Sequence, residues 1–186
     1  MEFTETNFPF LMIIMCISLF RIIQLRISTV KLLSKRITEV KSKYPELTKK
    51  HLKYRQNQIV KYQRVHFNSK LRNISQSILS FGTIIGIIGA LFILIFTKTI
   101  ALSCLLLALS GYFVSVLLLS RPSMNESYIF WNNYLERNPD NPLKIVLLPK
   151  EQAERLFKNE RKIGWYLAIV ATVFGIFSFF ASNLNL

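Results

Sequence analysis

The chain has 186 residues and a net charge of +14, with 24 Lys and Arg against 10 Asp and Glu, and 51% of its residues are hydrophobic. This length would suit one soluble domain, but long stretches without an ionisable residue argue against a soluble fold. Cys16 and Cys104 fall in different apolar stretches, which does not fit a disulfide framework. We expect both thiols to act as small apolar side chains.

The segment 1–25 is interpreted as an outer N-terminus followed by a first membrane span. Residues 8–25 form a mainly apolar stretch with one charge, Arg21, which lies close enough to the inner end for its side chain to reach the lipid headgroups. Glu2 and Glu5 precede this stretch without any basic residue, unlike the positively charged start of a secretory signal peptide. We therefore expect the first span to be retained as an anchor.

The segment 26–73 is strongly basic, with 14 Lys and Arg against 2 Glu. Apolar residues recur in its first part at spacings of three and four, which predicts an amphipathic helix with one apolar stripe: Val30, Leu33, Ile37, Val40 and Tyr44. This helix is expected to end at Pro45, and either to extend the first span as a stalk or to lie on anionic headgroups. A second helix is predicted to start at Pro45 and to run unbroken into the next span.

The segment 74–120 contains two apolar runs, at 74–96 and 100–119, which hold no Asp, Glu, Lys, Arg or His. As helices, these runs would each be about 30 Å long or more, enough to cross the hydrocarbon core of a bilayer. One helix through both runs would be about twice too long for one crossing. The sequence therefore predicts a transmembrane helical hairpin with a tight turn at residues 97–99.

The segment 121–162 is predicted to be a cytoplasmic loop with short helices. Ser123 and Glu126 have the spacing of a capping box, which predicts that a helix starts there. Residues 138–142 have the composition of a turn. The apolar run 143–148 is expected to form a strand-like stretch or to dock on the membrane face.

The segment 163–186 is interpreted as a fourth span followed by an outer C-terminus. Pro149 is expected to open a helix that continues without a break into this span. Segments 26–73 and 121–162 together hold 22 of the 24 Lys and Arg, and such residues gather on the cytoplasmic side of membranes. The predicted fold is thus all-α: a polytopic integral membrane protein with four transmembrane helices, cytoplasmic helical extensions and both termini outside.

Small residues recur at spacings of three and four along three of the predicted spans. They allow helix backbones to approach closely, so these positions are candidates for helix packing. The partner helix belongs either to the same chain or to another copy, and we expect a homo-oligomer. The packing candidates are Gly82, Gly86, Gly89, Ala108, Gly111, Ala168, Ala171, Gly175 and Ser178.

Residue types that carry out catalysis or bind metals are not grouped at any recognisable spacing. His51 and His66 have no Cys or carboxylate at ligand spacing, and no phosphate-binding glycine loop or nucleophile motif occurs. Arg21 is the one charged residue within a predicted span, and its place near the end is unlike the buried charges of transporters. We expect no enzymatic activity, no metal site and no cofactor.

The basic segment carries aromatic residues among its charges, and a short aromatic helix follows in segment 121–162. Lys and Arg near a membrane attract anionic lipid headgroups, and Tyr and Trp are enriched at the energetic centres of protein interfaces. We expect anionic lipid and an acidic cytoplasmic protein as partners, and nucleic acid only indirectly. The candidate contact residues are Lys49, Lys50, Lys53, Arg55, Lys61, Arg64, Trp131 and Tyr134.

The arrangement of four spans with two basic loops resembles the small membrane subunits encoded in prokaryotic antiphage defence operons, such as Kiwa-type systems. The resemblance implies an oligomer in the bacterial inner membrane that registers membrane perturbation and acts through a cytoplasmic partner. The leading hypothesis is a non-enzymatic membrane scaffold or sensor. The alternatives are a pore-forming effector or its immunity protein, and an accessory subunit of a larger membrane complex.

Overall fold

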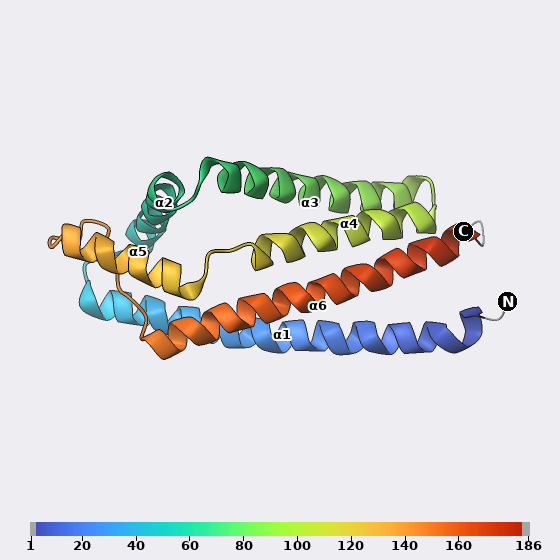
Figure 1. Cartoon of the computed structure of the whole chain (residues 1–186), viewed down its shortest axis with the longest axis horizontal. Helices are drawn as coiled ribbons and strands as arrows, with labels where there is room; N and C mark the ends of the chain where they lie inside the picture. Colours follow the sequence, from blue (N-terminus) through green and yellow to red (C-terminus); the bar gives the residue numbers. More distant parts are fainter. Residues whose placement is uncertain (1–2, 184–186) are drawn as a thin grey trace. The chain divides into compact units, whose positions relative to one another are not determined.

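The computed structural model describes residues 3–183, with the side chains of residues 8–182 (Figure 1). This part of the chain folds into six α-helices and contains no strand, which confirms the predicted all-α fold. The predicted outer termini include residues 1–2 and 184–186, which lie outside the described residues. The helices are α1 (Phe3–Lys43), α2 (Lys49–His66), α3 (Lys70–Phe96), α4 (Ile100–Leu119), α5 (Met124–Arg137) and α6 (Lys150–Asn183).

Helices α1, α3, α4 and α6 are each long and apolar enough to cross a membrane. Their outward-facing side chains include many large apolar residues that are mostly exposed, among them Phe81, Ile88 and Phe179. Apolar side chains exposed at this density suit contact with lipid tails rather than with water. The chain is therefore an integral membrane protein with four spans.

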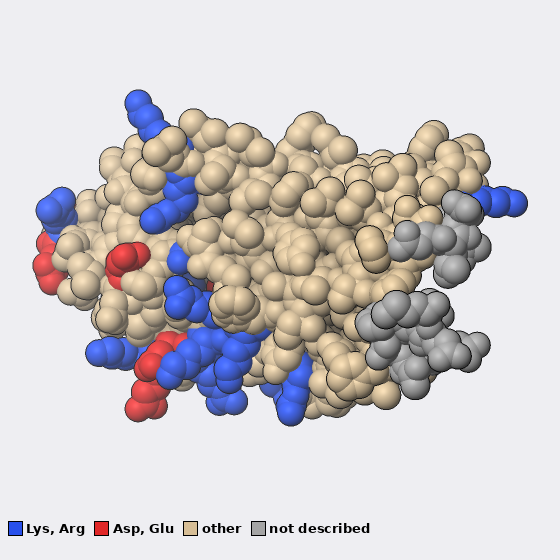
Figure 2. All heavy atoms as spheres, turned by 45° about the vertical axis from the view of Figure 1, so that its right-hand side comes forward, with Lys and Arg blue, Asp and Glu red and all other residues tan. Residues whose placement is uncertain are grey.

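The chain divides into two compact units. The spanning unit contains Met1–Arg26, Gln76–Arg121 and Glu160–Leu186, and the basic unit contains Ile27–Ser75 and Pro122–Asn159. Figure 2 shows a broad region of the surface without Lys, Arg, Asp or Glu. The spanning unit holds 6 Lys and Arg against 3 Asp and Glu. The basic unit, in contrast, holds 18 Lys and Arg against 7 Asp and Glu, a net charge of +11.

The structure contains the predicted hairpin of the second and third spans. Helix α3 ends at Phe96 and α4 begins at Ile100, so that the two helices run side by side in opposite directions (Figure 1). Lys98 has a positive φ of 56°, which lets the chain reverse within three residues. Thr97 Oγ1 donates a hydrogen bond to the carbonyl oxygen of Ile93 (2.8 Å) at the end of α3.

Helix α1 runs without a break into the basic unit and ends at Lys43, before Pro45, as the sequence predicts. Its last part, within the basic unit, packs through a face made mostly of residues other than those of the predicted stripe.

Most of the predicted apolar stripe on α1 is exposed, so the stripe is not the face through which this part of the helix packs within the chain. Thr29 and Val40 are only 1% and 2% exposed, whereas Val30 and Ile37 are 61% and 51% exposed. Arg36 lies on the buried face, at helical spacing from Thr29 and Val40, and is half-buried. An Arg can lie on a packed face because the long aliphatic part of its side chain covers apolar surface while its charged end reaches outward.

The predicted start of the second helix at Pro45 is wrong. Helix α2 begins at Lys49, because the Thr48 hydroxyl accepts the backbone N–H of His51 (3.3 Å) and so acts as the N-cap.

The expected unbroken helix into the second span is interrupted at residues 67–69. Asn73 Nδ2 donates to the carbonyl oxygen of Arg64 (2.9 Å), and Ser69 Oγ accepts the backbone N–H of Arg72 (3.2 Å). Such bonds between side chains and backbone offer the chain an alternative to helical hydrogen bonds. They separate α2 from α3.

Two predicted helix starts are confirmed. Ser123 Oγ accepts the N–H of Glu126 (3.2 Å), and the Glu126 carboxylate accepts the N–H of Ser123 (3.0 Å), which completes the capping box of α5. Helix α6 begins directly after Pro149 and continues without a break into the fourth span.

The run 143–148 does not form the strand that was one of its two predicted forms. It is irregular backbone, and Ile145 and Leu148 are buried within the protein, at 2% and 7% exposure. Ile145 packs with Ile59 of α2 and Tyr134 of α5 in the hydrophobic core of the basic unit. Ile145 and Leu148 are thus buried between helices and do not pair as a strand.

Candidate functional site

Helix α3 lies against α4 at the three glycines predicted to pack. A Cβ atom at Gly82 would lie 2.8 Å from the ring of Phe113, and one at Gly86 would overlap Ser110 Oγ. At Gly89 the Cβ atom would lie 3.3 Å from α4. These separations are shorter than ordinary van der Waals contacts, so the missing side chains allow the two helices to approach.

Helices α4 and α6 pack through small residues of the same chain. A Cβ atom at Gly111 would lie 2.9 Å from the Cβ atom of Ala171, which leaves no room for a side chain. At Gly175 the nearest atom would be the Cβ of Ala108 at 3.9 Å, an ordinary contact. Ala168, also predicted to pack, is half-buried.

Two buried serines connect α4 and α6 at separate points of this contact. Ser115 Oγ of α4 donates to the carbonyl oxygen of Gly164 (2.8 Å), and Ser178 Oγ of α6 donates to that of Ala101 (2.7 Å). The start of α4 therefore lies beside the end of α6, so the two helices are antiparallel. Interhelical hydrogen bonds of this kind contribute about 0.6 kcal/mol on average in membranes.

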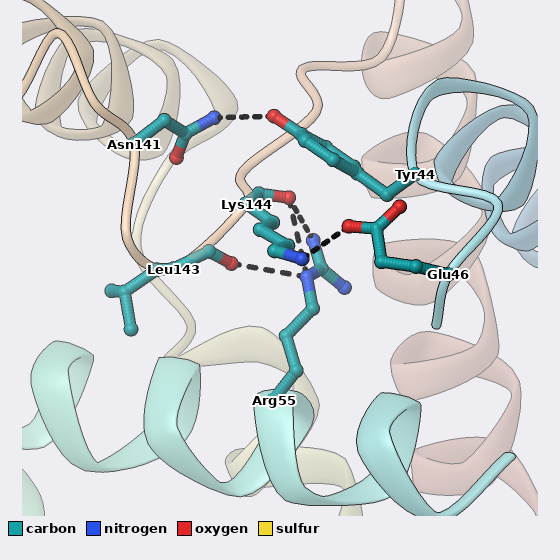
Figure 3. A network of polar contacts seen from close by, with 6 residues as sticks. All are labelled: Tyr44, Glu46, Arg55, Asn141, Leu143 and Lys144. Carbon is teal, nitrogen blue, oxygen red and sulfur yellow. Dashed lines mark hydrogen bonds and ion pairs between the residues drawn. The ribbon is translucent and has the colours of Figure 1, made fainter. Parts of the chain in front are cut away.

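In the basic unit, Arg55 of α2 holds the loop that follows α5 (Figure 3). Its Nε donates to the carbonyl oxygens of Leu143 (3.0 Å) and Lys144 (3.2 Å), and its Nη2 donates to that of Lys144 (2.8 Å). Burial lowers the pKa of Arg55, and the charge of Arg36 lowers it further. The sequence predicts a surface contact for Arg55, whereas its guanidinium is part-buried and bonded within the chain.

The same loop contains two residues with a positive φ, Asn141 (45°) and Lys144 (50°). Asn141 fits this conformation because its side chain bonds to both the N–H (2.7 Å) and the carbonyl (2.9 Å) of Ile145. Its Nδ2 also donates to the hydroxyl of Tyr44 (3.1 Å). Lys144 is less suited to a positive φ, and its ammonium pairs with the Glu46 carboxylate and lies 5.2 Å from the centroid of the Tyr44 ring.

The hydrogen bond from Lys144 lowers the pKa of Glu46 below its usual value. The stability this pair contributes is fully present above the pKa of Glu in an unfolded chain and is lost as the pH falls through the lowered pKa. Because Glu46 is exposed, solvent screening keeps the contribution small.

An aromatic cluster joins α2 to α5. The ring centroid of Tyr62 lies 5.0 Å from that of Tyr134, 6.0 Å from Phe130 and 6.1 Å from Trp131. Tyr134 is 4% exposed, burial raises the pKa of its phenol, and its hydroxyl accepts the N–H of Leu143 (3.3 Å). The sequence predicts partner contacts for Trp131 and Tyr134, whereas the structure buries Tyr134 in the core and half-buries Trp131.

The other predicted contact residues lie on the surface of α2. All are exposed, the sequence of α2 contains no Asp or Glu, and none of these side chains forms an ion pair within the described chain. They form the cation row: Lys49, Lys50, Lys53, Lys61 and Arg64.

His51 and His66 are both exposed on α2. Among residues 3–183, no group of three or more His, Cys, Asp and Glu side chains lies close enough to hold a metal ion.

The chain matches no protein-family model, no curated protein and no solved structure.

Proposed function

We propose that the chain is a non-enzymatic scaffold or sensor subunit of the bacterial inner membrane, with its basic unit in the cytoplasm, where it recruits an acidic protein partner. The cation row on α2 carries this proposal. Lys49 and Lys53 are four residues apart on the helix, and Lys61 and Arg64 are three apart. Like charges at these spacings repel each other and destabilise a helix, and a partner with acidic side chains would remove that repulsion.

Charge complementarity also determines how such a partner would bind. An uncompensated positive surface attracts an acidic protein from a distance and raises the rate of association. Salt screens this attraction over about 8 Å at physiological ionic strength, so binding is expected to weaken as salt is added.

The contacts within the spanning unit suit a subunit that responds to the state of the membrane. Helices in lipid are held by dispersion between close surfaces and by a few hydrogen bonds, without a hydrophobic driving force. Gly111 and Ala171 form such a close contact. This contact depends on how tightly the surrounding lipid presses the helices together. Since the small residues of α4 and α6 are used within the chain, the homo-oligomer would form through the lipid-exposed faces. A defence role of the Kiwa type would follow if a change in this helix packing led the basic unit to recruit its partner.

A reporter active only in the periplasm is expected to give signal when fused after Leu186 and none when fused near Lys53, because basic loops stay in the cytoplasm. The measurement is enzymatic activity of an alkaline phosphatase fusion in intact cells. A reporter active only in the cytoplasm, fused at the same positions, serves as the control and should give the reverse pattern. Signal near Lys53 from the periplasmic reporter would contradict the proposed topology.

The proposed recruitment is tested by changing Lys49, Lys50 and Lys53 together to Glu. We expect the partner that co-purifies with the unchanged chain in mild detergent, identified by mass spectrometry, to be lost while the variant still fractionates with membranes. A matched control changes three exposed lysines of α1 to Glu and alters the net charge equally: Lys31, Lys35 and Lys41.

The control is expected to retain the partner. Equal loss in both variants would show that net charge alone matters and would contradict a site on α2. Retained recruitment in the α2 variant, together with membrane depolarisation on expression, would favour the pore-forming alternative.

A further inference from the structure

A cleft opens between α2 and α5, within the basic unit and beside the aromatic cluster. Its volume is about 220 Å³. This is smaller than the roughly 300–1,000 Å³ of sites that enclose a whole small molecule, so the cleft has room for one large side chain. The lining residues are Tyr62, His66, Phe130, Asn133, Tyr134 and Arg137.

Aromatic rings make the apolar wall of the cleft. The Tyr62 ring centroid lies 4.3 Å from the His66 ring and 5.0 Å from the Tyr134 ring. The ring centroid of Phe130 lies 6.0 Å from that of Tyr62 and 4.8 Å from that of Trp131. Tyr134 is buried in the core and Tyr62 packs against that core, so these two rings are held in place before any ligand arrives. A wall of this kind favours an aromatic or branched apolar side chain.

Two polar side chains of the cleft, Asn133 and Arg137, are not used by the fold. Both are exposed, and neither makes a side-chain hydrogen bond or ion pair within the part of the chain that the structure describes. No lining residue carries a carboxylate. The five N–H groups of an Arg are arranged to bind a carboxylate through two parallel bonds.

We infer that this cleft binds an acidic segment of a protein, which inserts one apolar side chain between the rings and places a neighbouring carboxylate on Arg137. The inference rests on the proposed function and extends it, because it names the feature of the partner that the chain recognises. The net charge of +11 on the basic unit attracts such a segment, and the cleft selects among acidic segments by the apolar side chain.

The test uses the full chain in nanodiscs of zwitterionic lipid, with Trp165→Phe so that Trp131, 4.8 Å from the Phe130 ring, is the remaining fluorescent indole. The probe is the peptide acetyl-Asp-Glu-Phe-Asp-Glu-amide, and its comparator carries Gly in place of Phe at the same charge. We expect the Phe peptide to change the fluorescence of Trp131 and to bind roughly tenfold more tightly than the Gly peptide.

Arg137→Gln is expected to weaken binding of the Phe peptide by roughly tenfold, as for the loss of a hydrogen bond to a charged group. Arg155→Gln removes the same charge from an exposed position of α6 that does not line the cleft, and should leave binding unchanged. Equal affinity for the two peptides, or equal effects of the two variants, would overturn the inference. Tighter binding of adenosine monophosphate than of the Phe peptide would also overturn it, in favour of a nucleotide site.

The variants distinguish failure of the cleft from failure of the cation row. If Arg137→Gln keeps the co-purifying partner and the α2 triple variant loses it, the proposed function stands and the cleft is not its recognition site. If the peptides are discriminated by the cleft but no partner is recruited, the cleft binds acidic segments and the proposed function fails.

Discussion

Replacing Gly111 with Ala is expected to lower the stability of the spanning unit by about 1–3 kcal/mol, the usual effect of overpacking, and replacing it with Leu should lower it more. The added Cβ atom would lie 2.9 Å from the Cβ of Ala171 and 3.5 Å from its Cα. The neighbouring atoms belong to the backbone and to the side chain closest to it, so they cannot rotate away. The measurement is the thermal unfolding midpoint of the purified chain in a mild detergent.

Gly175→Ala is the matched control, on the partner helix of the same contact. Its Cβ atom would lie 3.9 Å from Ala108, which is ordinary contact. Ala is favoured over Gly inside a helix by roughly 0.5–1 kcal/mol, so this change should leave stability unchanged or raise it. Equal losses at Gly111 and Gly175 would mean that α4 and α6 are not packed in this way.

Replacing Arg55 with Met is expected to release the loop after α5 from α2. Hydrogen bonds to charged groups contribute about 1.5–3 kcal/mol, and Arg55 makes its bonds to two neighbouring carbonyl groups. Their loss removes the support for the positive φ of Lys144, and it frees the segment that keeps Ile145 buried. We expect a lower unfolding temperature and faster proteolytic cleavage between residues 142 and 149.

Lys53→Met makes a similar chemical change at an exposed position of the same helix and should alter neither property. Arg55→Lys keeps the charge but not the planar group that reaches two carbonyls, and should show part of the loss. Unchanged cleavage in Arg55→Met would show that the loop is held by its apolar residues alone.

Local signals in the sequence predict much of this fold. The uncharged runs predict the spans because nothing but a helix of that length satisfies the backbone in lipid. Ser123 and Glu126 predict the start of α5 because both partners of the capping box lie within one turn. The glycines and alanines of the spans are visible as repeats, but their mutual distances are not, so Gly111 and Gly175 look alike in sequence and differ in the structure.

Contacts between distant parts of the chain are what the sequence does not reveal. Arg55 and Leu143 are 88 positions apart, and nothing near either residue indicates the other. Asn141 does carry a signal, because Asn tolerates a positive φ better than most residues and is common in turns. The break between α2 and α3 depends on Asn73, which reaches back nine residues to Arg64.

Aromatic residues are also ambiguous in sequence. A Tyr or Trp in a charged segment suits either a binding surface or the edge of a core where its polar atom finds a hydrogen-bond partner. Tyr134 is the second case, because it is buried and its hydroxyl accepts the N–H of Leu143. Nothing in the sequence indicates the cleft, because its walls come from two helices whose pairing no sequence pattern specifies.

The close contact and the two serine bonds between α4 and α6 together decide how this pair moves. A slip of one helical turn, about 5.4 Å, would place the Cβ atom of Ala108 opposite Ala171, where only the missing side chain of Gly111 leaves room. Ser115 and Ser178 hold the pair in one register, since a slip would break both bonds at once. If α6 were pushed along its axis, it would therefore carry α4 with it and would not slide past it. The two helices thus form one mechanical element of the spanning unit.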